Sequence, residues 1–375
     1  MPEKLEQTKK FKGRIIYQIE PWIGTEEKRA VLEYLNSGGW LTEYKQTRRF
    51  ERMLAEYVGC KYVSVVSSGT AALTVALMGL DIKGGGEVIV PDFTMIASAN
   101  SVVLAGLKPV LVDIDRRNLC LDLNLVKKTV TPKTRAVMLV SLNGRSPDMD
   151  EFVDFCKDNN LFLIEDAAQS LGSKCKGKQL GTFGDVGCLS FSFPKIITTG
   201  QGGAILTNNK EVYDRVVMIK DFGRPVSGVD YHEIMGFNFK FTDLQAVIGI
   251  EQLKKIDYRV KRKKEMFKVY REFLEDVEEI EFIDTDLKDV TPWYMDIIVK
   301  DKRDGLAAYL KDRGIMTRPF YPAIHTQPPY SHVKGEFPNS EWAARNGLWL
   351  PSTPFLTDED IQYICSHIRE YFKKS

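Results

Sequence analysis

The sequence lacks a charge imbalance: lysine plus arginine number 52 and aspartate plus glutamate 51, a net charge of +1 over 375 residues. Nucleic acids and anionic membranes are bound through basic patches, so neither partner is expected. The longest apolar runs, at 87–91 and 136–142, are far shorter than the roughly 20 residues of a membrane-spanning helix. The N-terminus also lacks the apolar stretch of a signal peptide. We therefore expect a cytoplasmic protein.

Metal-binding and nucleotide-binding signatures are also missing. The six cysteines form no CxxC pair and no compact cluster with histidine, which argues against a zinc site or an iron–sulfur cluster; no metal is expected. Neither GxxxxGK[ST] nor GxGxxG after a first strand occurs, so a nucleotide phosphate loop and a dinucleotide fold are excluded.

Residues 60–210 alternate short apolar, β-branched runs with helical stretches. This succession predicts βαβ units and a mostly parallel sheet covered by helices, with ligands at the carboxyl ends of the strands. Two helices are expected before the sheet, one from Thr25 as N-cap to Gly38–Gly39 and another around 47–59. The 43% of hydrophobic residues suffices for a large core.

The C-terminal third has a different pattern. A helix is predicted from 242 to 256, and the basic run that follows at 257–277 is interpreted as a solvated helix face. A strand at 295–299, a helix from 303, a proline-rich stretch at 317–330 and a closing helix near 358 predict a smaller α+β domain. We expect two domains: residues 1–255 with the N-terminal arm and the sheet, and residues 256–375.

Three places in the predicted sheet region carry chemistry. Ser68, Gly69 and Thr70 follow a strand and open a helix, which favours either a phosphate site at the helix N-terminus or simple helix capping. Asp166 ends an apolar strand, where it suits a protonated ring nitrogen or serves as a helix N-cap. Lys195 has apolar neighbours, so it either is a partly desolvated amine suited to Schiff-base chemistry or packs its stem with the ammonium in water.

Five segments resemble, in this order, the pyridoxal phosphate (PLP) dependent sugar aminotransferases of the DegT/StrS family: SSGTAAL (67–73), EVIVPDFT (87–94), LFLIEDAAQS (161–170), GTFGDVGCLSFSFPKIITTGQGGAI (181–205) and FNFKFTDLQAVIGIEQL (237–253). The resemblance covers nearly the whole chain. It implies the aspartate aminotransferase fold (fold type I): a large α/β domain with a mostly parallel sheet flanked by helices, and a small C-terminal α+β domain.

The resemblance also implies roles for single residues. Lys195 is expected to bind PLP covalently, Asp166 to partner the pyridine nitrogen and Gln169 to lie near the ring hydroxyl. The phosphate is expected to lie against Ser68, Gly69, Thr70 and Ser190 and to be reached by Asn238 of a neighbouring subunit, which implies a homodimer with shared active sites. Tyr321 and His325 are expected to border the sugar pocket.

Three departures from the family pattern bear on the site. Met95 stands where many members have an aromatic residue on the cofactor ring; it packs there through its thioether or belongs to the core. Ser141, Asn143 and Arg145 replace an HLYG-like segment, which bears on substrate specificity, and Gln201 replaces an acid in the glycine loop.

The implied activity is transfer of the amino group of L-glutamate to a nucleotide-linked keto-deoxysugar. KIITTGQGG (195–203) resembles members that aminate C4. The alternatives are a 3-keto-sugar or cyclitol aminotransferase, a sugar dehydratase, and a PLP-binding regulator without catalysis. Lys195 disfavours the dehydratase, because that enzyme has histidine in place of the lysine.

Overall fold

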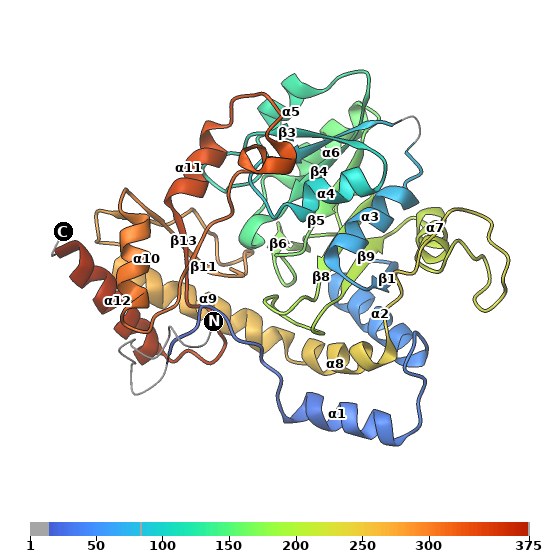
Figure 1. Cartoon of the computed structure of the whole chain (residues 1–375), viewed down its shortest axis with the longest axis horizontal. Helices are drawn as coiled ribbons and strands as arrows, with labels where there is room; N and C mark the ends of the chain where they lie inside the picture. The colour runs from blue at the N-terminus through green and yellow to red at the C-terminus, as the bar shows by residue number, and fades with distance from the viewer. Residues whose placement is uncertain (1–14, 83–84, 374–375) are drawn as a thin grey trace.

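A seven-stranded sheet forms the centre of the computed structural model, which describes residues 15–82 and 85–373 (Figure 1). Residues 1–14, 83–84 and 374–375 lie outside this part. The expectation about a signal peptide depends on residues 1–14, and the predicted N-terminal arm begins with them. The order across the sheet is β1 (Tyr62–Val66), β9 (Gly203–Thr207), β8 (Val186–Ser190), β5 (Phe162–Asp166), β4 (Thr134–Val140), β2 (Glu87–Pro91) and β3 (Lys108–Val112).

The sheet is parallel from β8 to β3, and β9 runs antiparallel to both of its neighbours, β1 and β8. The prediction of a mostly parallel sheet within fold type I is thereby confirmed. Because β9 runs in the opposite direction, its first residue lies at the edge where β1 and β8 end, and Gly203 pairs with both Val66 and Ser190. That edge holds the site described below.

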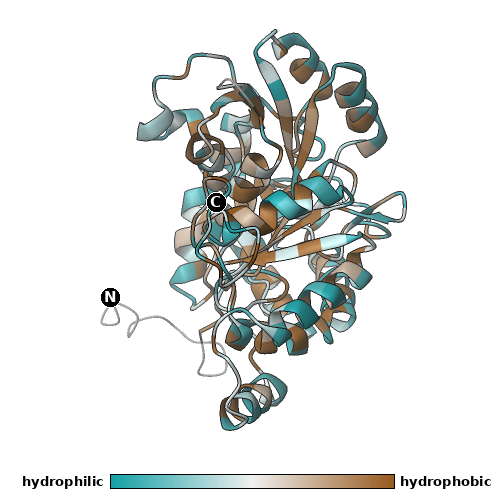
Figure 2. Cartoon of the chain, turned by 90° about the vertical axis from the view of Figure 1, so that its right-hand side faces the viewer, coloured by the Kyte–Doolittle hydropathy of each residue, from teal (hydrophilic) through white to brown (hydrophobic). Residues whose placement is uncertain are grey.

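Helices cover both faces, because successive side chains of a strand point to opposite sides. One face packs Val88, Val90 and Met138 against α3 (Gly69–Gly79), α4 (Ala97–Leu104) and α7 (Lys210–Lys220). The other face packs Ile89 and Leu139 against α5 (Leu123–Thr129) and α6 (Met149–Asp158). Figure 2 shows the strands mostly hydrophobic and the outer helices with hydrophilic outer faces.

Three N-terminal and middle helices lie beside the β1 end of the sheet. They are α1 (Thr25–Asn36), α2 (Lys45–Val58) and α8 (Asp243–Leu253), and α8 packs on both others. The N-cap of α1 is Gly24 and not Thr25: the Gly24 N–H donates a hydrogen bond of 2.7 Å to Oε2 of Glu27, the third residue of the helix. Asp243 connects α8 to the start of α2 by accepting backbone hydrogen bonds from Tyr44, Gln46 and Thr47.

A four-stranded antiparallel sheet with its own core forms the other lobe. Its order is β10 (Ile280–Glu281), β11 (Met295–Val299), β13 (Gly347–Leu350) and β12 (Arg318–Pro319), and its helices are α9 (Ile256–Leu274), α10 (Arg303–Lys311), α11 (Pro338–Asn346) and α12 (Asp358–Lys373). A small hairpin, β6 (Lys174–Cys175) and β7 (Lys178–Gln179), completes the strands. The domain boundary after residue 255 stays a prediction.

One prediction about α9 is wrong in part. The basic run was interpreted as a solvated face, but Arg259 and Lys263 are buried, with 5% and 6% of their surface exposed. Arg259 donates to the Ile196 carbonyl, and Lys263 donates to the carbonyls of Trp293 and Ser352. Backbone acceptors on both lobes therefore compensate the burial of these two side chains. No helix of the described residues is long and apolar enough to cross a membrane.

Candidate active site

A cavity of about 220 Å³ lies where β1, β5 and β8 end and β9 begins. It is lined by ten of the residues singled out from the sequence: Ser68, Gly69, Thr70, Met95, Asp166, Gln169, Ser190, Lys195, Gln201 and Tyr321. They come from segments up to 253 positions apart only because parallel strands end at one edge of the sheet. Met95 lines this cavity and is 45% exposed, so the alternative that it is a core residue is wrong.

The first turn of α3 forms one end of the cavity. Ser68 is the N-cap, and its Oγ accepts the N–H of Ala71 at 3.0 Å, so the capping alternative holds. Capping does not remove the anion site, because the first N–H groups of a helix have no acceptor within the helix. A Cβ at Gly69 would lie 2.9 Å from Cβ of Ser190, so only glycine allows β8 to approach this turn so closely.

Two acids end β5 and point to opposite faces. Glu165 is fully buried and accepts the N–H groups of Gly181, Phe183 and Gly184 at 2.6–2.8 Å, so it holds a loop. Asp166 faces the cavity. Its Oδ2 accepts from the Ser98 hydroxyl at 2.7 Å, and Oδ1 accepts the N–H of Ala168 at 3.2 Å in a turn.

No helix begins after Asp166, so the N-cap alternative for this residue is wrong. Burial raises the pKa of Asp166, and the two hydrogen bonds and nearby Lys195 oppose that rise only in part. A buried carboxylate of this kind is stabilised by a cationic ligand group in the cavity.

Gln169 presents a defined group to the cavity. Its Oε1 accepts the N–H of Asn143 at 2.9 Å, so its NH₂ is the end left to act as a donor. Asn143 itself adopts a positive φ of 54° and clamps Tyr294 of the other lobe, donating to the carbonyl at 2.9 Å and accepting the N–H at 2.7 Å.

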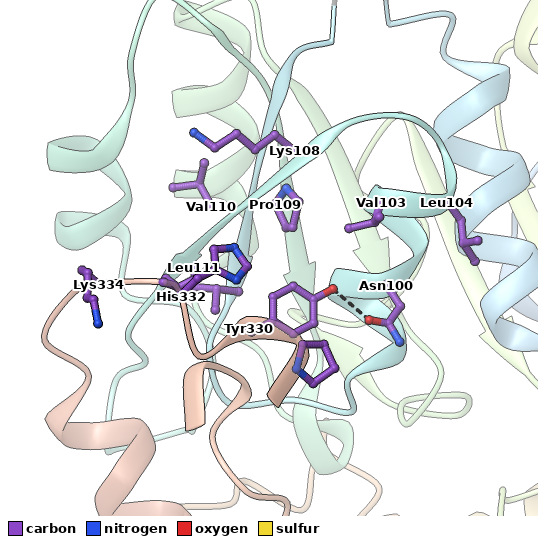
Figure 3. A pocket seen from close by; sticks show the side chains of 12 residues that line it. Asn100, Val103, Leu104, Lys108, Pro109, Val110, Leu111, Tyr330, His332 and Lys334 are labelled. Carbon is purple, nitrogen blue, oxygen red and sulfur yellow. Dashed lines mark hydrogen bonds between the residues drawn. The ribbon is translucent and has the colours of Figure 1, made fainter. Parts of the chain in front are cut away.

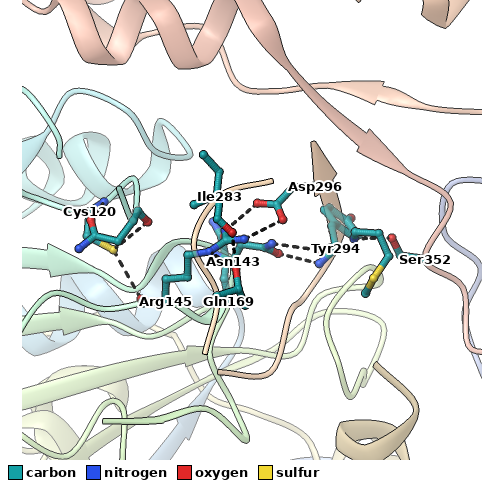
Figure 4. Close-up of polar contacts among 11 residues, drawn as sticks. Cys120, Asn143, Arg145, Gln169, Ile283, Tyr294, Asp296 and Ser352 are labelled. Carbon is teal, nitrogen blue, oxygen red and sulfur yellow. Dashed lines mark hydrogen bonds and ion pairs between the residues drawn. The ribbon is translucent and has the colours of Figure 1, made fainter. Parts of the chain in front are cut away.

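Arg145 and Asn143 belong to a buried polar network and do not line the cavity (Figure 4). Arg145 binds Asp296 of β11 through two bonds of 2.6 and 2.8 Å and donates from Nε to Thr285. The side-chain partners of Asn143 and Arg145 are protein groups that join the two lobes, and the bearing of this departure on substrate specificity stays a prediction. Ser141 is buried as well, and its hydroxyl has no partner among the described residues.

Lys195 lies in the segment between β8 and β9. Its pKa is lowered from 10.5 to about 8, mainly by desolvation; the charge of Asp166 opposes this fall, and the charge of Arg318 adds to it. The Nζ atom lies 3.8 Å from the centre of the Trp293 ring. A substantial fraction of this amine is therefore neutral near pH 8, as nucleophilic and proton-transfer chemistry requires.

Two of the further lining residues bear on the chemistry and were not indicated by the sequence, Trp293 and Arg318. Arg318 lies over the rings of Tyr321 and Trp349, and among the described residues no carboxylate forms an ion pair with it. A signal was available: Arg318 precedes Tyr321 by three residues in the segment RPFYP. Trp293 had no comparable signal, since it reads as the start of a strand.

Two predicted residues do not line the cavity. His325 contacts the buried Asp92 through Nδ1 at 2.7 Å and stacks on Phe337. Asn238 is exposed and bridges by its backbone to Asp221, on a segment that carries exposed apolar side chains.

The model of the DegT/DnrJ/EryC1/StrS aminotransferase family matches residues 21–369. The chain belongs to this family. It is therefore a PLP-dependent aminotransferase.

Three similar proteins show the range of the family. GDP-perosamine synthase of Escherichia coli O157:H7 is 37% identical over 361 residues, covering 95% of this chain and 98% of that protein. The dTDP-4-dehydro-2,3,6-trideoxy-D-glucose 4-aminotransferase of Saccharopolyspora spinosa is 32% identical, covering 94% and 95%. The crystal structure of DesV from S. venezuelae is 32% identical, with a TM-score of 0.87, covering 92% of this chain and 94% of that one.

The residues of this aminotransferase fit PLP on their own chemistry. One end of the cavity has a helix N-terminus with hydroxyls of Ser68, Thr70 and Ser190, which suits a phosphate. The buried Asp166 suits a protonated ring nitrogen, and the Gln169 amide suits a ring oxygen. Bound PLP supplies the electron sink that carbon–hydrogen cleavage next to nitrogen needs.

A larger cavity of this aminotransferase, about 710 Å³, lies between α4, β3 and residues 329–334 (Figure 3). Its wall is mainly apolar, its only side-chain hydrogen bond in the view joins Tyr330 to Asn100, and no carboxylate lines it. Lys108 and Lys334 line it, but no acid lies beside them in its wall, so size alone does not identify the active site.

Proposed function

We propose that this aminotransferase moves the amino group of L-glutamate to C4 of a nucleotide-linked 4-keto-deoxysugar, in amino-sugar biosynthesis. The observation that carries the proposal is the joint placement of Lys195, Asp166 and Gln169 around one cavity beside a helix N-terminus. The relatives named as nucleotide-sugar enzymes, one of them a 4-aminotransferase, support the sugar class and the position.

In this proposal each residue has a physical task. The N-terminus of α3, with Ser68, Gly69, Thr70 and Ser190, holds the cofactor phosphate, and Asp166 keeps the ring nitrogen protonated. The Nζ atom of Lys195 binds the cofactor and, when released, takes the proton from the α-carbon of glutamate.

Arg318 offers a positive charge to a carboxylate of the amino donor. It lies beside Lys195 in the cavity and lacks a carboxylate partner among the described residues, so we assign it to a carboxylate of L-glutamate. Tyr321 lines the same cavity and is assigned to the sugar side, and Met95 is assigned to the face of the cofactor ring. His325 stays a prediction as a sugar-pocket residue, because its ring is engaged by Asp92.

The activity test uses purified holoenzyme, L-glutamate and a panel of TDP-, GDP- and UDP-linked keto-sugars, with release of 2-oxoglutarate as the readout. Amination at C4 of one 4-keto sugar, located by NMR of the product, is the expected result. Lys195→Ala should abolish release, whereas Lys128→Ala, which changes an exposed lysine, should leave it unchanged. A product aminated at C3 or on a cyclitol would overturn the C4 assignment, and no turnover at all would favour a regulator.

Cofactor attachment is tested separately. Borohydride reduction of the holoenzyme should fix PLP on the peptide that contains Lys195. A modified peptide elsewhere, or protein that takes up no PLP, would contradict the site.

We further propose that the enzyme is a homodimer in which Asn238 of one subunit reaches the phosphate of the other. Support comes from exposed apolar side chains near Asn238, among them Tyr231, Met235 and Phe237, which are 62%, 76% and 44% exposed. A mixture of Lys195→Ala and Asn238→Ala subunits, unfolded and refolded together, should regain activity, since half-and-half dimers contain one intact site. Failure to regain activity in a confirmed mixed dimer would refute site sharing. The cytoplasmic location stays a prediction.

A further inference from the structure

Trp293 lies directly beneath the reactive end of Lys195. The Lys195 Nζ atom is 3.8 Å from the centre of the Trp293 ring, and the indole is 3% exposed. A lysine that merely packs places its methylene stem on a ring and its nitrogen in water. Here the nitrogen itself is over the ring face, which is the geometry of a cation–π contact.

The indole is held from several sides. The indole Nε1 donates to the Pro194 carbonyl at 2.6 Å, and the backbone carbonyl of Trp293 accepts from Nζ of Lys263 at 2.8 Å. The backbone of the next residue, Tyr294, donates one hydrogen bond to the Asn143 side chain and accepts another from it. The rings of Trp293 and Tyr294 stack with centres 3.9 Å apart. A ring fixed in this way is preorganised, so placing an amine over it requires no rearrangement.

We propose that Trp293 is a positioning residue that receives the Lys195 side chain whenever this lysine is not bound to cofactor, and that its ring face stabilises the ammonium form. The proposal rests on the assignment of Lys195 as the cofactor lysine. In each half-reaction Lys195 Nζ accepts a proton as an amine, holds it as an ammonium and gives it up again, so the proton count closes. During the interval the buried ammonium needs a favourable site, and the indole provides one without forming a salt bridge that would trap the proton.

The surrounding charges explain why a neutral ring is suitable there. Asp166 from β5 favours the ammonium, whereas Arg318 from β12 opposes it. Arg259 and Lys263 of α9 lie on the far side, beside the Lys195 segment, and Tyr321 closes the cavity. Since Asp166 is to be engaged by the cofactor ring, the indole face, 3.8 Å from Nζ, stays available to attract the ammonium.

The first experiment measures the Lys195 amine in cofactor-free protein. The rate of acetylation of the Lys195 peptide by acetic anhydride is followed by mass spectrometry against pH in wild type, Trp293→Phe and Trp293→Leu. Loss of the aromatic face should lower the apparent pKa by about one unit in Trp293→Leu, while Trp293→Phe keeps most of the wild-type value. Equal pKa values in wild type and Trp293→Leu would overturn the proposal.

The second experiment measures proton transfer in the holoenzyme. Exchange of the α-hydrogen of L-glutamate in D₂O, followed by NMR, should slow about tenfold or more in Trp293→Leu and less than threefold in Trp293→Phe. Trp342→Leu is the matched control, since this tryptophan also lies under a cation, with Arg116 at 4.0 Å from its ring, but lies outside the cavity. Its exchange rate should equal that of wild type.

The outcomes separate this inference from the proposed function. If borohydride fixes PLP to Lys195 and Trp293→Phe behaves no better than Trp293→Leu, the tryptophan has a merely structural role and the inference fails alone. If the cofactor is fixed to another residue, both the assignment of Lys195 as the cofactor lysine and the inference about Trp293 fail. Trp293→Leu protein that does not fold is replaced by Trp293→Met, whose flexible thioether chain adapts to the space left by the ring but offers no ring face.

Discussion

The ion pair between Arg145 and Asp296 should be among the most stability-sensitive contacts of the chain. Their side chains are 2% and 1% exposed, and the guanidinium makes two bonds to the carboxylate and one to Thr285. Asp296→Asn leaves the shape nearly unchanged but removes the countercharge of a buried cation. Breaking such a pair from one side costs about 3–5 kcal/mol, a large fraction of a net stability of about 5–15 kcal/mol.

The assay is urea unfolding of the cofactor-free protein, followed by tryptophan fluorescence. The matched control is Asp214→Ala, which breaks the exposed pair with Lys210, where both side chains are at least 50% exposed; we expect a loss of at most about 0.5 kcal/mol. The double change Arg145→Met with Asp296→Leu should recover most of the loss, because no uncompensated charge remains. A loss in Asp296→Asn no larger than in the control would refute the reasoning.

Three further perturbations address the site and the pH dependence of stability. Asp166→Asn keeps the hydrogen-bonding shape but removes the charge opposite the ring nitrogen; we expect α-hydrogen exchange of L-glutamate to fall about 10–100-fold, and an unchanged rate would argue against the role of Asp166. Arg318→Gln should raise the glutamate concentration at half-saturation about 30-fold or more while the half-reaction with the keto-sugar keeps its rate; equal effects on both would reassign Arg318 to the sugar nucleotide. Burial, and to a lesser degree Arg259, lowers the pKa of Lys263 from 10.5 to about 7. Between pH 7 and 10.5 the unfolded chain therefore binds more protons at this residue than the folded chain does, so Lys263 makes the free energy of unfolding rise with pH. Below pH 7 Lys263 is protonated in both states and contributes no pH dependence. Lys263→Met should flatten the rise measured by urea unfolding of the cofactor-free protein at pH 7 and 9, and an unchanged slope would show that Lys263 is not the titrating group.

The sequence predicted what depends on local pattern. The alternation of apolar runs and helices predicted the sheet, and the residues that follow β1, β5 and β8 were expected at one edge, where the structure has Ser68, Asp166 and Lys195. Strand direction alone brings these together, so no knowledge of side-chain packing was needed.

The roles of residues that pair across the two lobes could not be predicted from the sequence pattern. Asn143 and Arg145 lie 151 positions from Tyr294 and Asp296, and nothing in either segment indicates the pairing. Likewise, a run of basic residues does not reveal that Lys263 finds two carbonyls far along the chain. Trp293 reads as part of an ordinary strand until its ring is seen under Lys195.

The reversed direction of β9 has a consequence for engineering this chain. Because β8 and β9 are adjacent antiparallel strands, the segment 191–202 that carries Lys195 returns directly into the same sheet, with both ends fixed by pairing. The parallel neighbours β4 and β5 are instead joined through α6, a crossover on the outside of the sheet. Inserted sequence is therefore better placed at the outer ends of such crossovers, where added length changes only the surface. In the lysine segment, even one extra residue would change where the amine points.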